Sequence, residues 1–132
     1  MIDSSHYERL PIYKTAMDLM VKLDSIVHGF SRYHKYSIGM KLRDESLLLV
    51  NLIMQANVKE TRAQKTSELC QHVEQMKFLC NAAKEVQAWK SFKQFIQVME
   101  QVVSIARQAE GWRRSLSFKR PELSVSHQKV HS

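Results

Sequence analysis

The segment FSRYHKYSIGMKLR, residues 30–43, combines cations with aromatic rings and contains no acidic residue. Its basic residues are Arg32, Lys35, Lys41 and Arg43, and the rings among them are Tyr33, His34 and Tyr36. Cations neutralise the phosphates of a nucleic acid, and flat rings stack on its bases. The pattern therefore favours a nucleic-acid contact, and it fits a solvated basic connector equally well.

The sequence lacks the residue patterns that catalysis or metal binding would need. Di-iron bundles carry Glu-x-x-His pairs, and this chain has none. Glu68 and His72 are four residues apart and are expected to form an exposed pair on one helix. Cys70 and His72 lack the second ligand pair of a zinc site, and there is no glycine-rich phosphate loop. We therefore expect a protein without enzymatic activity, with no cofactor and no metal.

The composition suggests an anionic partner for a chain of 132 residues, which is the size of one domain. Twenty Lys and Arg residues against 13 Asp and Glu residues give a net charge of +7. Such an excess fits a nucleic acid or an acidic surface. The longest apolar run, residues 47–50, is far shorter than the ~20 residues of a membrane span. Asp3 and Glu8 stand where a signal peptide would have a basic region and an apolar core. We therefore expect a cytoplasmic protein without membrane contact.

Helices must position these residues, because apolar side chains recur at helical spacing along most of the chain. Gly29 is expected to end the first helix, and the second begins near Ser37. The polar residues 57–67 predict a turn, although the third helix can already begin at Thr61. Ser91 is the expected N-cap of the fourth. The apolar stripes are Ile12, Ala16, Leu19, Leu23, Ile26 and Phe30; Ile38, Leu42, Leu49, Ile53 and Ala56; Leu69, Val73, Met76, Cys80, Ala83 and Val86; and Phe92, Phe95, Met99, Val102, Ala106 and Ala109.

Four amphipathic helices joined by short turns predict an all-α fold, an up-down-up-down antiparallel four-helix bundle. The bundle domain is expected to cover residues 1–116, with Gly111 closing the last helical pattern. Residues 117–132 lack periodicity and are rich in Ser, Lys and His. This segment is predicted to be a disordered basic C-terminal tail.

Several local patterns, taken together over residues 7–116, resemble one known family. The matching segments are FSRYHKYSIG at residues 30–39, Ala56-Asn57, and Gly111-Trp112 followed by Arg113-Arg114. They resemble the Avd-like four-helix proteins, the accessory variability determinants of bacterial and phage diversity-generating retroelements. A sister group is encoded in intervening sequences of 23S ribosomal RNA genes. The chain departs from the family pattern at Ser31, where proline is expected, and at Lys35, where arginine is usual; lysine keeps the charge but cannot make arginine's bidentate phosphate contact.

The resemblance implies a noncatalytic, basic protein that assembles as a ring-like homopentamer. It also implies binding to a partner reverse transcriptase and to the template RNA or its DNA copy, in support of mutagenic retrohoming. The expected nucleic-acid contacts are Arg32, Lys35, Lys41 and Arg43 at the first junction, and Arg113 and Arg114 near the end of the fourth helix. In an antiparallel bundle these two groups lie at opposite ends.

Two other interpretations stay open. The chain can instead be a protein of the 23S ribosomal intervening-sequence type, whose role is unknown. It can also be a structural or adaptor bundle that binds no nucleic acid and whose basic charge only keeps it in solution. Charge reversal at the first junction separates the adaptor from the nucleic-acid binder, because only the latter should lose its ligand.

Overall fold

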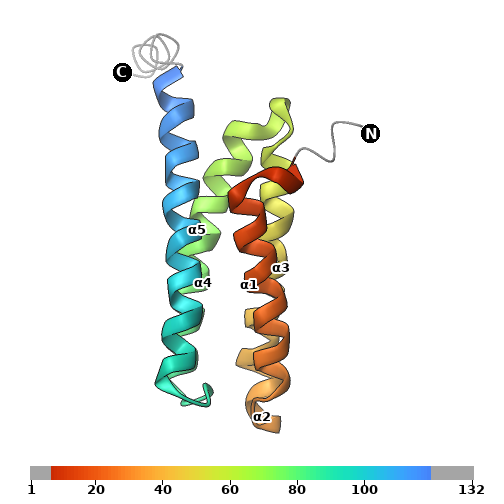
Figure 1. The fold of residues 1–132 in the computed structure, drawn as a ribbon, viewed down its shortest axis with the longest axis vertical. Helices are drawn as coiled ribbons and strands as arrows, with labels where there is room; N and C mark the ends of the chain where they lie inside the picture. The colour runs from red at the N-terminus through yellow and green to blue at the C-terminus, as the bar shows by residue number, and fades with distance from the viewer. Residues whose placement is uncertain (1–6, 120–132) are drawn as a thin grey trace, which may run out of the picture.

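The computed structural model describes residues 7–119, which form helices joined by short turns (Figure 1). In chain order these are α1 (Pro11–His28), α2 (Arg32–Lys35), α3 (Ile38–Ala56), the 3₁₀ helix η2 (Lys59–Thr61), α4 (Arg62–Glu85) and α5 (Phe92–Lys119). No strand occurs in this part of the chain. Of the segment predicted as a disordered tail, residues 117–119 continue α5 as helix, and residues 120–132 lie outside the described residues.

The four long helices pack as an antiparallel bundle. α1 lies against α3 and α5, and α4 lies against the same two helices, so each long helix has two neighbours. The single-turn helix α2 packs on α3 at the end where α1 finishes. The predicted all-α four-helix bundle is confirmed. None of the described helices combines the length and the apolar character that crossing a membrane requires.

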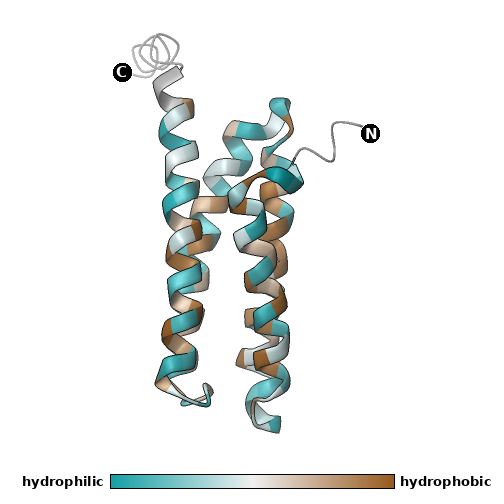
Figure 2. Cartoon of the chain, viewed as in Figure 1, coloured by the Kyte–Doolittle hydropathy of each residue, from teal (hydrophilic) through white to brown (hydrophobic). Residues whose placement is uncertain are grey.

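The core lies between the helices, where their apolar stripes meet (Figure 2). Most of the predicted stripe residues are buried, including Leu19, Leu42 and Leu69. Burial of each such side chain contributes roughly 1.5–3 kcal/mol. In α1 the buried position is Val27 rather than the predicted Ile26, which is only partly buried.

The predicted core register of α5 is partly wrong. Phe92 is 66% exposed, and Met99 and Ala106 are only partly buried. The predicted Phe95, Val102 and Ala109 are buried, and Val98 and Ile105 are buried beside them. Phe92 lies three residues before Phe95, so spacing alone allows it on this stripe, but it is the first residue of α5 and lies outside the packed core. Val86, the last residue of the predicted third stripe, is also exposed because α4 ends at Glu85.

The predicted helix ends are partly confirmed. Gly29 is the C-cap of α1. Ser91 Oγ accepts a hydrogen bond from the Gln94 amide at 3.1 Å, as an N-cap does. Gly111 does not close the last helix: α5 continues through it to Lys119. Glycine at this position only lowers the local helix propensity.

Candidate nucleic-acid interface

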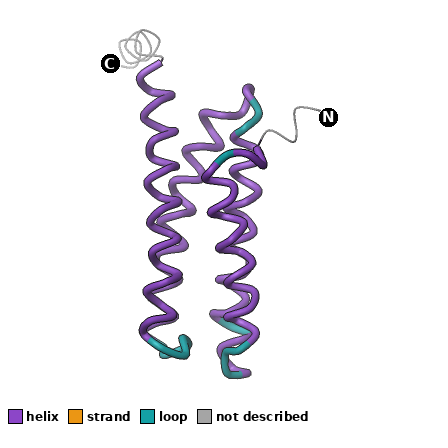
Figure 3. The backbone as a smooth tube through the Cα atoms, in the orientation of Figure 1, coloured by secondary structure: helices purple, strands orange, loops and turns teal. Residues whose placement is uncertain are grey.

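The bundle has two ends, which we name by the connections they carry (Figure 3). The junction pole comprises residues 29–37, which link α1 to α3, and residues 86–91, which link α4 to α5. The terminal pole comprises residues 7–10, residues 57–61 and the last turns of α5. An up-down-up-down chain places the first and third connections together, and the structure does so.

The junction between α1 and α3 is anchored from inside the bundle. Phe30 is 5% exposed, and its ring packs edge-on against Trp89, with ring centroids 5.6 Å apart. Ser31 Oγ accepts a hydrogen bond from the His34 amide at 3.4 Å. Ser37 Oγ donates to the Tyr33 carbonyl at 2.8 Å. These contacts fix the single turn of α2 against the end of the bundle.

Gly39 allows α3 to start close against α1. A Cβ built on Gly39 would lie 2.7 Å from Val27 Cγ1 and 2.8 Å from the His34 carbonyl oxygen. Both distances are shorter than a carbon atom can occupy without a shift of its neighbours. The glycine of the segment FSRYHKYSIG therefore has a packing role, which is separate from any ligand contact.

The side chains of α2 and its flanks point outward. Tyr33 is 79% exposed and Tyr36 is 65% exposed, and Arg32 is exposed as well. Lys35 is partly buried. Neither Arg32 nor Lys35 forms an ion pair with any residue between 7 and 119. Cations and flat rings thus share one exposed turn.

Lys90 joins this group from the other connection of the junction pole. Its ammonium lies against Gly29, because a Cβ built on that glycine would come within 3.1 Å of Lys90 Nζ. The turn that carries Lys90 is held by Trp89, whose Nε1 donates to the Cys80 carbonyl at 3.1 Å. Sequence reasoning missed Lys90, although the antiparallel topology places residues 86–91 beside residues 29–37.

Lys41 and Arg43, the other two predicted contacts at this junction, differ in their surroundings. Lys41 is exposed on the first turns of α3 and forms no ion pair among the described residues. Arg43 instead contacts Asp24 on α1: its Nε lies 3.4 Å from Oδ1, and its Nη2 donates to the Asp24 carbonyl at 3.2 Å. Arg43 therefore links α1 to α3, and its charge is largely compensated.

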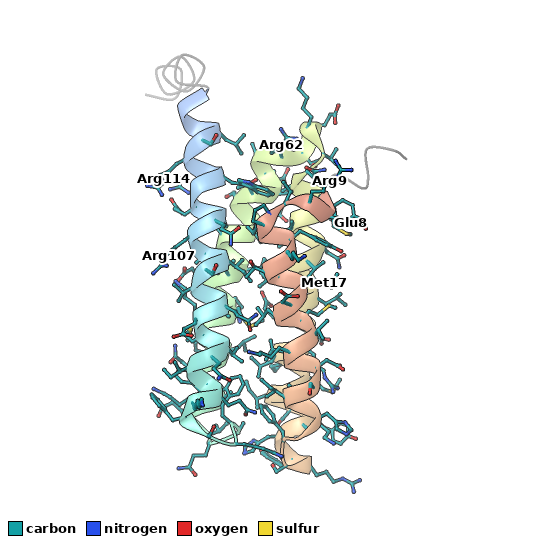
Figure 4. The ribbon with its side chains drawn as sticks, in the orientation of Figure 1. Glu8, Arg9, Met17, Arg62, Arg107 and Arg114 are labelled. Carbon is teal, nitrogen blue, oxygen red and sulfur yellow. The ribbon has the colours of Figure 1, made fainter. Side chains whose placement is uncertain are left out.

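The two predicted contacts on α5 lie near the terminal pole, away from the junction pole. Arg113 Nε donates to Glu110 Oε2 at 3.0 Å. This hydrogen bond lowers the pKa of the Glu110 carboxyl below its ordinary value. Arg114 is exposed and points away from the bundle, as Arg107 does about two turns earlier (Figure 4). The structure does not bring the two predicted groups together in one protomer.

The terminal pole uses another arginine to complete a helix end. Arg62 Nε donates to the Ala56 carbonyl at 3.1 Å, and its Nη2 donates to the Asn57 carbonyl at 3.0 Å. These are carbonyls at the end of α3 that have no partner within the helix. A pocket of about 290 Å³ lies beside Arg62, and both Trp112 and the buried Thr66 line it.

His72, Glu68 and Cys80, which could take part in chemistry, are held within the fold. His72 Nδ1 lies 2.6 Å from Glu45 Oε2 on α3, so the predicted Glu68–His72 pair is wrong. Glu68 instead accepts from Lys65 at 3.4 Å. Burial raises the pKa of the Cys80 thiol to about 12, which keeps it protonated and unreactive near neutral pH. No group of three or more metal-ligating side chains lies together within residues 7–119.

The fold and this surface define a four-helix bundle with a basic, aromatic pole. Comparison of the chain with protein-family models gives no match, and comparison with curated proteins gives none either. The similarity to the Avd-like proteins therefore rests on the sequence segments given above, of which residues 30–39 are the longest.

Proposed function

We propose that this chain is a noncatalytic accessory protein of a bacterial or phage diversity-generating retroelement, acting in the cytoplasm. It binds a reverse transcriptase and nucleic acid, either the template RNA or its DNA copy, and supports mutagenic retrohoming. The observation that carries the nucleic-acid part is that Arg32, Lys35 and Lys90 at the junction pole, and Lys41 on the adjoining first turn of α3, have no acidic partner among the described residues. The retroelement part rests on the resemblance of residues 30–39.

Binding through phosphates has a defined salt dependence. Each neutralised phosphate releases counterions, so the logarithm of the binding constant falls with a slope of about −0.7 per contact on a single strand. Three engaged cations then predict a slope of about −2 against the logarithm of salt concentration. Sequence preference should be weak, because phosphates carry no base information.

A charge-reversal experiment tests the nucleic-acid part. The triple variant Arg32→Glu/Lys35→Glu/Lys41→Glu should lose most of its affinity for a long RNA in an anisotropy titration. The matched control reverses Lys14, Lys59 and Arg107, which are exposed and lie outside the junction pole. It changes the net charge by the same amount and should keep most of the affinity. Equal loss in both variants would show that only the net charge matters.

Arg43 is left out of this variant because its reversal would place a glutamate beside Asp24 and break a contact between α1 and α3. A loss of binding could then reflect a loss of structure. Thermal unfolding followed by circular dichroism should give the same midpoint for the triple variant and the native chain. A lower midpoint would mean that the triple variant is destabilised. Single substitutions of Arg32, Lys35 and Lys41 would then replace the triple variant in the titration.

The reverse-transcriptase part needs a separate test. The tagged chain should co-purify with a polymerase encoded beside it, and nuclease treatment should leave that association intact. A neighbouring reverse transcriptase and repeat pair distinguishes the retroelement from the ribosomal intervening-sequence type. Association that nuclease abolishes would mean that nucleic acid alone bridges the two proteins.

An exposed apolar surface supports assembly of the chain into a homo-oligomer, a pentamer by resemblance. Met40 and Leu47 lie seven residues apart on α3 and are 47% and 50% exposed. Val21 on α1 is 59% exposed and lines the same groove as Leu47. Leu47→Glu should reduce the mass measured by light scattering, whereas Phe78→Glu on α4, at a residue that is 62% exposed, should not. An unchanged mass in Leu47→Glu would place the contact elsewhere.

The adaptor interpretation is favoured by the same apolar surface, because a second protein could cover it instead of a second copy. It predicts a monomer in isolation and partner binding that survives the Arg32, Lys35 and Lys41 reversal. The retroelement proposal instead predicts an oligomer in isolation and loss of nucleic-acid binding in the same variant.

A further inference from the structure

Resting on the proposed nucleic-acid binding, we infer that the junction pole binds single-stranded nucleic acid and stacks bases on Tyr33 and Tyr36. Both rings are exposed, at 79% and 65%, although an aromatic side chain normally buries most of its surface. Tyr33 lies in the single turn of α2 and Tyr36 directly follows it, and the cations Arg32, Lys35 and Lys90 lie in the same pole.

The two rings do not complete the core. Trp89 and Phe30 close the bundle at this end, and Trp89 also contacts Phe95. The Tyr33 ring has one aromatic neighbour, His34, in an edge-on arrangement with centroids 5.3 Å apart. Because Tyr33 is 79% exposed, most of its surface remains accessible to a further group.

Exposed aromatic rings on a protein favour binding of unpaired bases. In a duplex each base already has stacked neighbours on both sides, so a protein ring gains contact only by disrupting that stack. Bases of a single strand have free faces, and rings beside a cationic groove bind them with little sequence preference. Phe92, 66% exposed at the start of α5, provides another ring at the same pole.

The arrangement also positions the phosphates. Lys90 lies beside Gly29, so the connection between α4 and α5 contributes a cation next to the α2 turn. Lys90 forms no ion pair within the described part of the chain. A strand that crosses from α2 to the α4–α5 turn would meet Arg32 and Lys35 first and Lys90 afterwards, with the tyrosine rings near its path.

The test compares three dye-labelled probes, each 12 nucleotides or base pairs long, titrated with the full chain by anisotropy at low salt. They are oligo(dT), an abasic strand of the same length, and a blunt duplex. Oligo(dT) should bind at least about fivefold more tightly than the abasic strand, as expected when one or more bases stack. The duplex should bind less tightly than oligo(dT), although its phosphates are more densely spaced.

Three variants assign the effect to the rings. Tyr33→Leu/Tyr36→Leu should reduce oligo(dT) affinity to the abasic level, while Tyr33→Phe/Tyr36→Phe should retain the preference. Phe78→Leu removes a ring that is 62% exposed on α4 and should change nothing. All three variants should have the same thermal unfolding midpoint as the native chain, because the replaced side chains lie on the surface.

The outcomes separate this inference from the proposed function. If the three probes bind equally well and the leucine variant matches the native chain, only phosphates are bound and the inference is overturned, while nucleic-acid binding stands. Binding of the duplex that is tighter than that of oligo(dT) also overturns it. If none of the probes binds at low salt, both the inference and the nucleic-acid part of the proposed function are wrong.

Discussion

At the junction pole, Arg32 and Lys90 have no acidic partner among the described residues, whereas at the terminal pole Arg62 and Arg113 donate to groups of the fold itself. The contrast lies in these four cations, because Arg9, Lys59 and Arg114 at the terminal pole also form no ion pair among the described residues. A cation whose hydrogen-bond donors already have acceptors must lose them before it can bind a phosphate. Positive charge in a sequence indicates a ligand site only where the fold leaves that charge without a partner.

The poles also differ in how they are closed. The junction pole is closed by a cluster of rings, Phe30, Trp89 and Phe95, and by the glycine at position 39. At the terminal pole, Trp112 is only partly buried and lines a pocket of about 290 Å³. A rigidly packed end can present surface side chains in fixed positions, which binding requires.

The largest expected effect comes from removing the ring that closes the junction pole. Trp89→Ala should lower the free energy of unfolding by about 3–5 kcal/mol, because it deletes a buried ring and leaves a cavity. The Cys80 carbonyl also loses its hydrogen bond from Trp89 Nε1. Trp112→Ala should cost less than half as much, since that ring is partly exposed. Urea titrations of both variants measure the difference, and equal losses would contradict the contrast in packing.

Two glycines give the next comparison, with effects of opposite sign. Gly39→Ala should destabilise the fold by about 1–3 kcal/mol, because the new methyl group meets Val27 and the backbone of His34. Gly111→Ala should stabilise it by about 0.5–1 kcal/mol, since a Cβ there meets nothing within 4 Å and alanine favours the helix. Thermal unfolding midpoints should move in opposite directions. A neutral Gly39→Ala would show that α1 and α3 can separate at this point.

The fold could be predicted because its determinants are local. Apolar spacing identifies a helix without knowledge of its neighbours, and short turns then require antiparallel packing. The register of α5 was harder, because Phe92 and Phe95 are equally apolar and only the packing decides which faces inward. Phe95 is buried and Phe92 is not.

The candidate site depended on contacts between helices, which a single sequence does not display. Arg43 and Asp24 are 19 residues apart on different helices, so their pairing could not be predicted from spacing on one helix. Lys90 lies about 60 residues from Arg32 in the chain, and only the topology brings the two connections to one end. The Glu68–His72 prediction failed for the same reason: His72 finds its partner, Glu45, on α3.

Arginine substitutions test the contrast between the poles most directly. Arg62→Ala removes two hydrogen bonds to carbonyls at the end of α3 and should lower the free energy of unfolding by about 1–2 kcal/mol. It should leave RNA affinity nearly unchanged. Arg32→Ala should do the reverse, with stability within about 0.5 kcal/mol of the native chain and weaker RNA binding. Urea titration and anisotropy on both proteins make the comparison.

Two results would contradict this contrast. If Arg62→Ala weakened RNA binding as much as Arg32→Ala, the terminal pole would also contribute to the interface despite its internal hydrogen bonds. If Arg32→Ala destabilised the fold by more than Arg62→Ala, Arg32 would have a structural partner in solution. Lysine replacements at both positions retain charge and separate the role of charge from that of the guanidinium geometry.

The smallest expected change in stability comes from replacing either of two serine caps of the junction pole, Ser91 and Ser31. Ser91 Oγ accepts from the Gln94 amide at 3.1 Å, and the Gln94 side chain accepts from the Lys90 amide at 3.0 Å. Ser91→Ala should therefore cost about 1 kcal/mol of stability, and Ser91→Asp should restore it. Ser31→Ala should cost less, because its bond to His34 is 3.4 Å long and caps a helix of four residues. If Ser31→Ala were instead the more costly change, α2 would depend on its own cap rather than on the anchor at Phe30. The turn would then not hold its side chains in fixed positions for a bound strand.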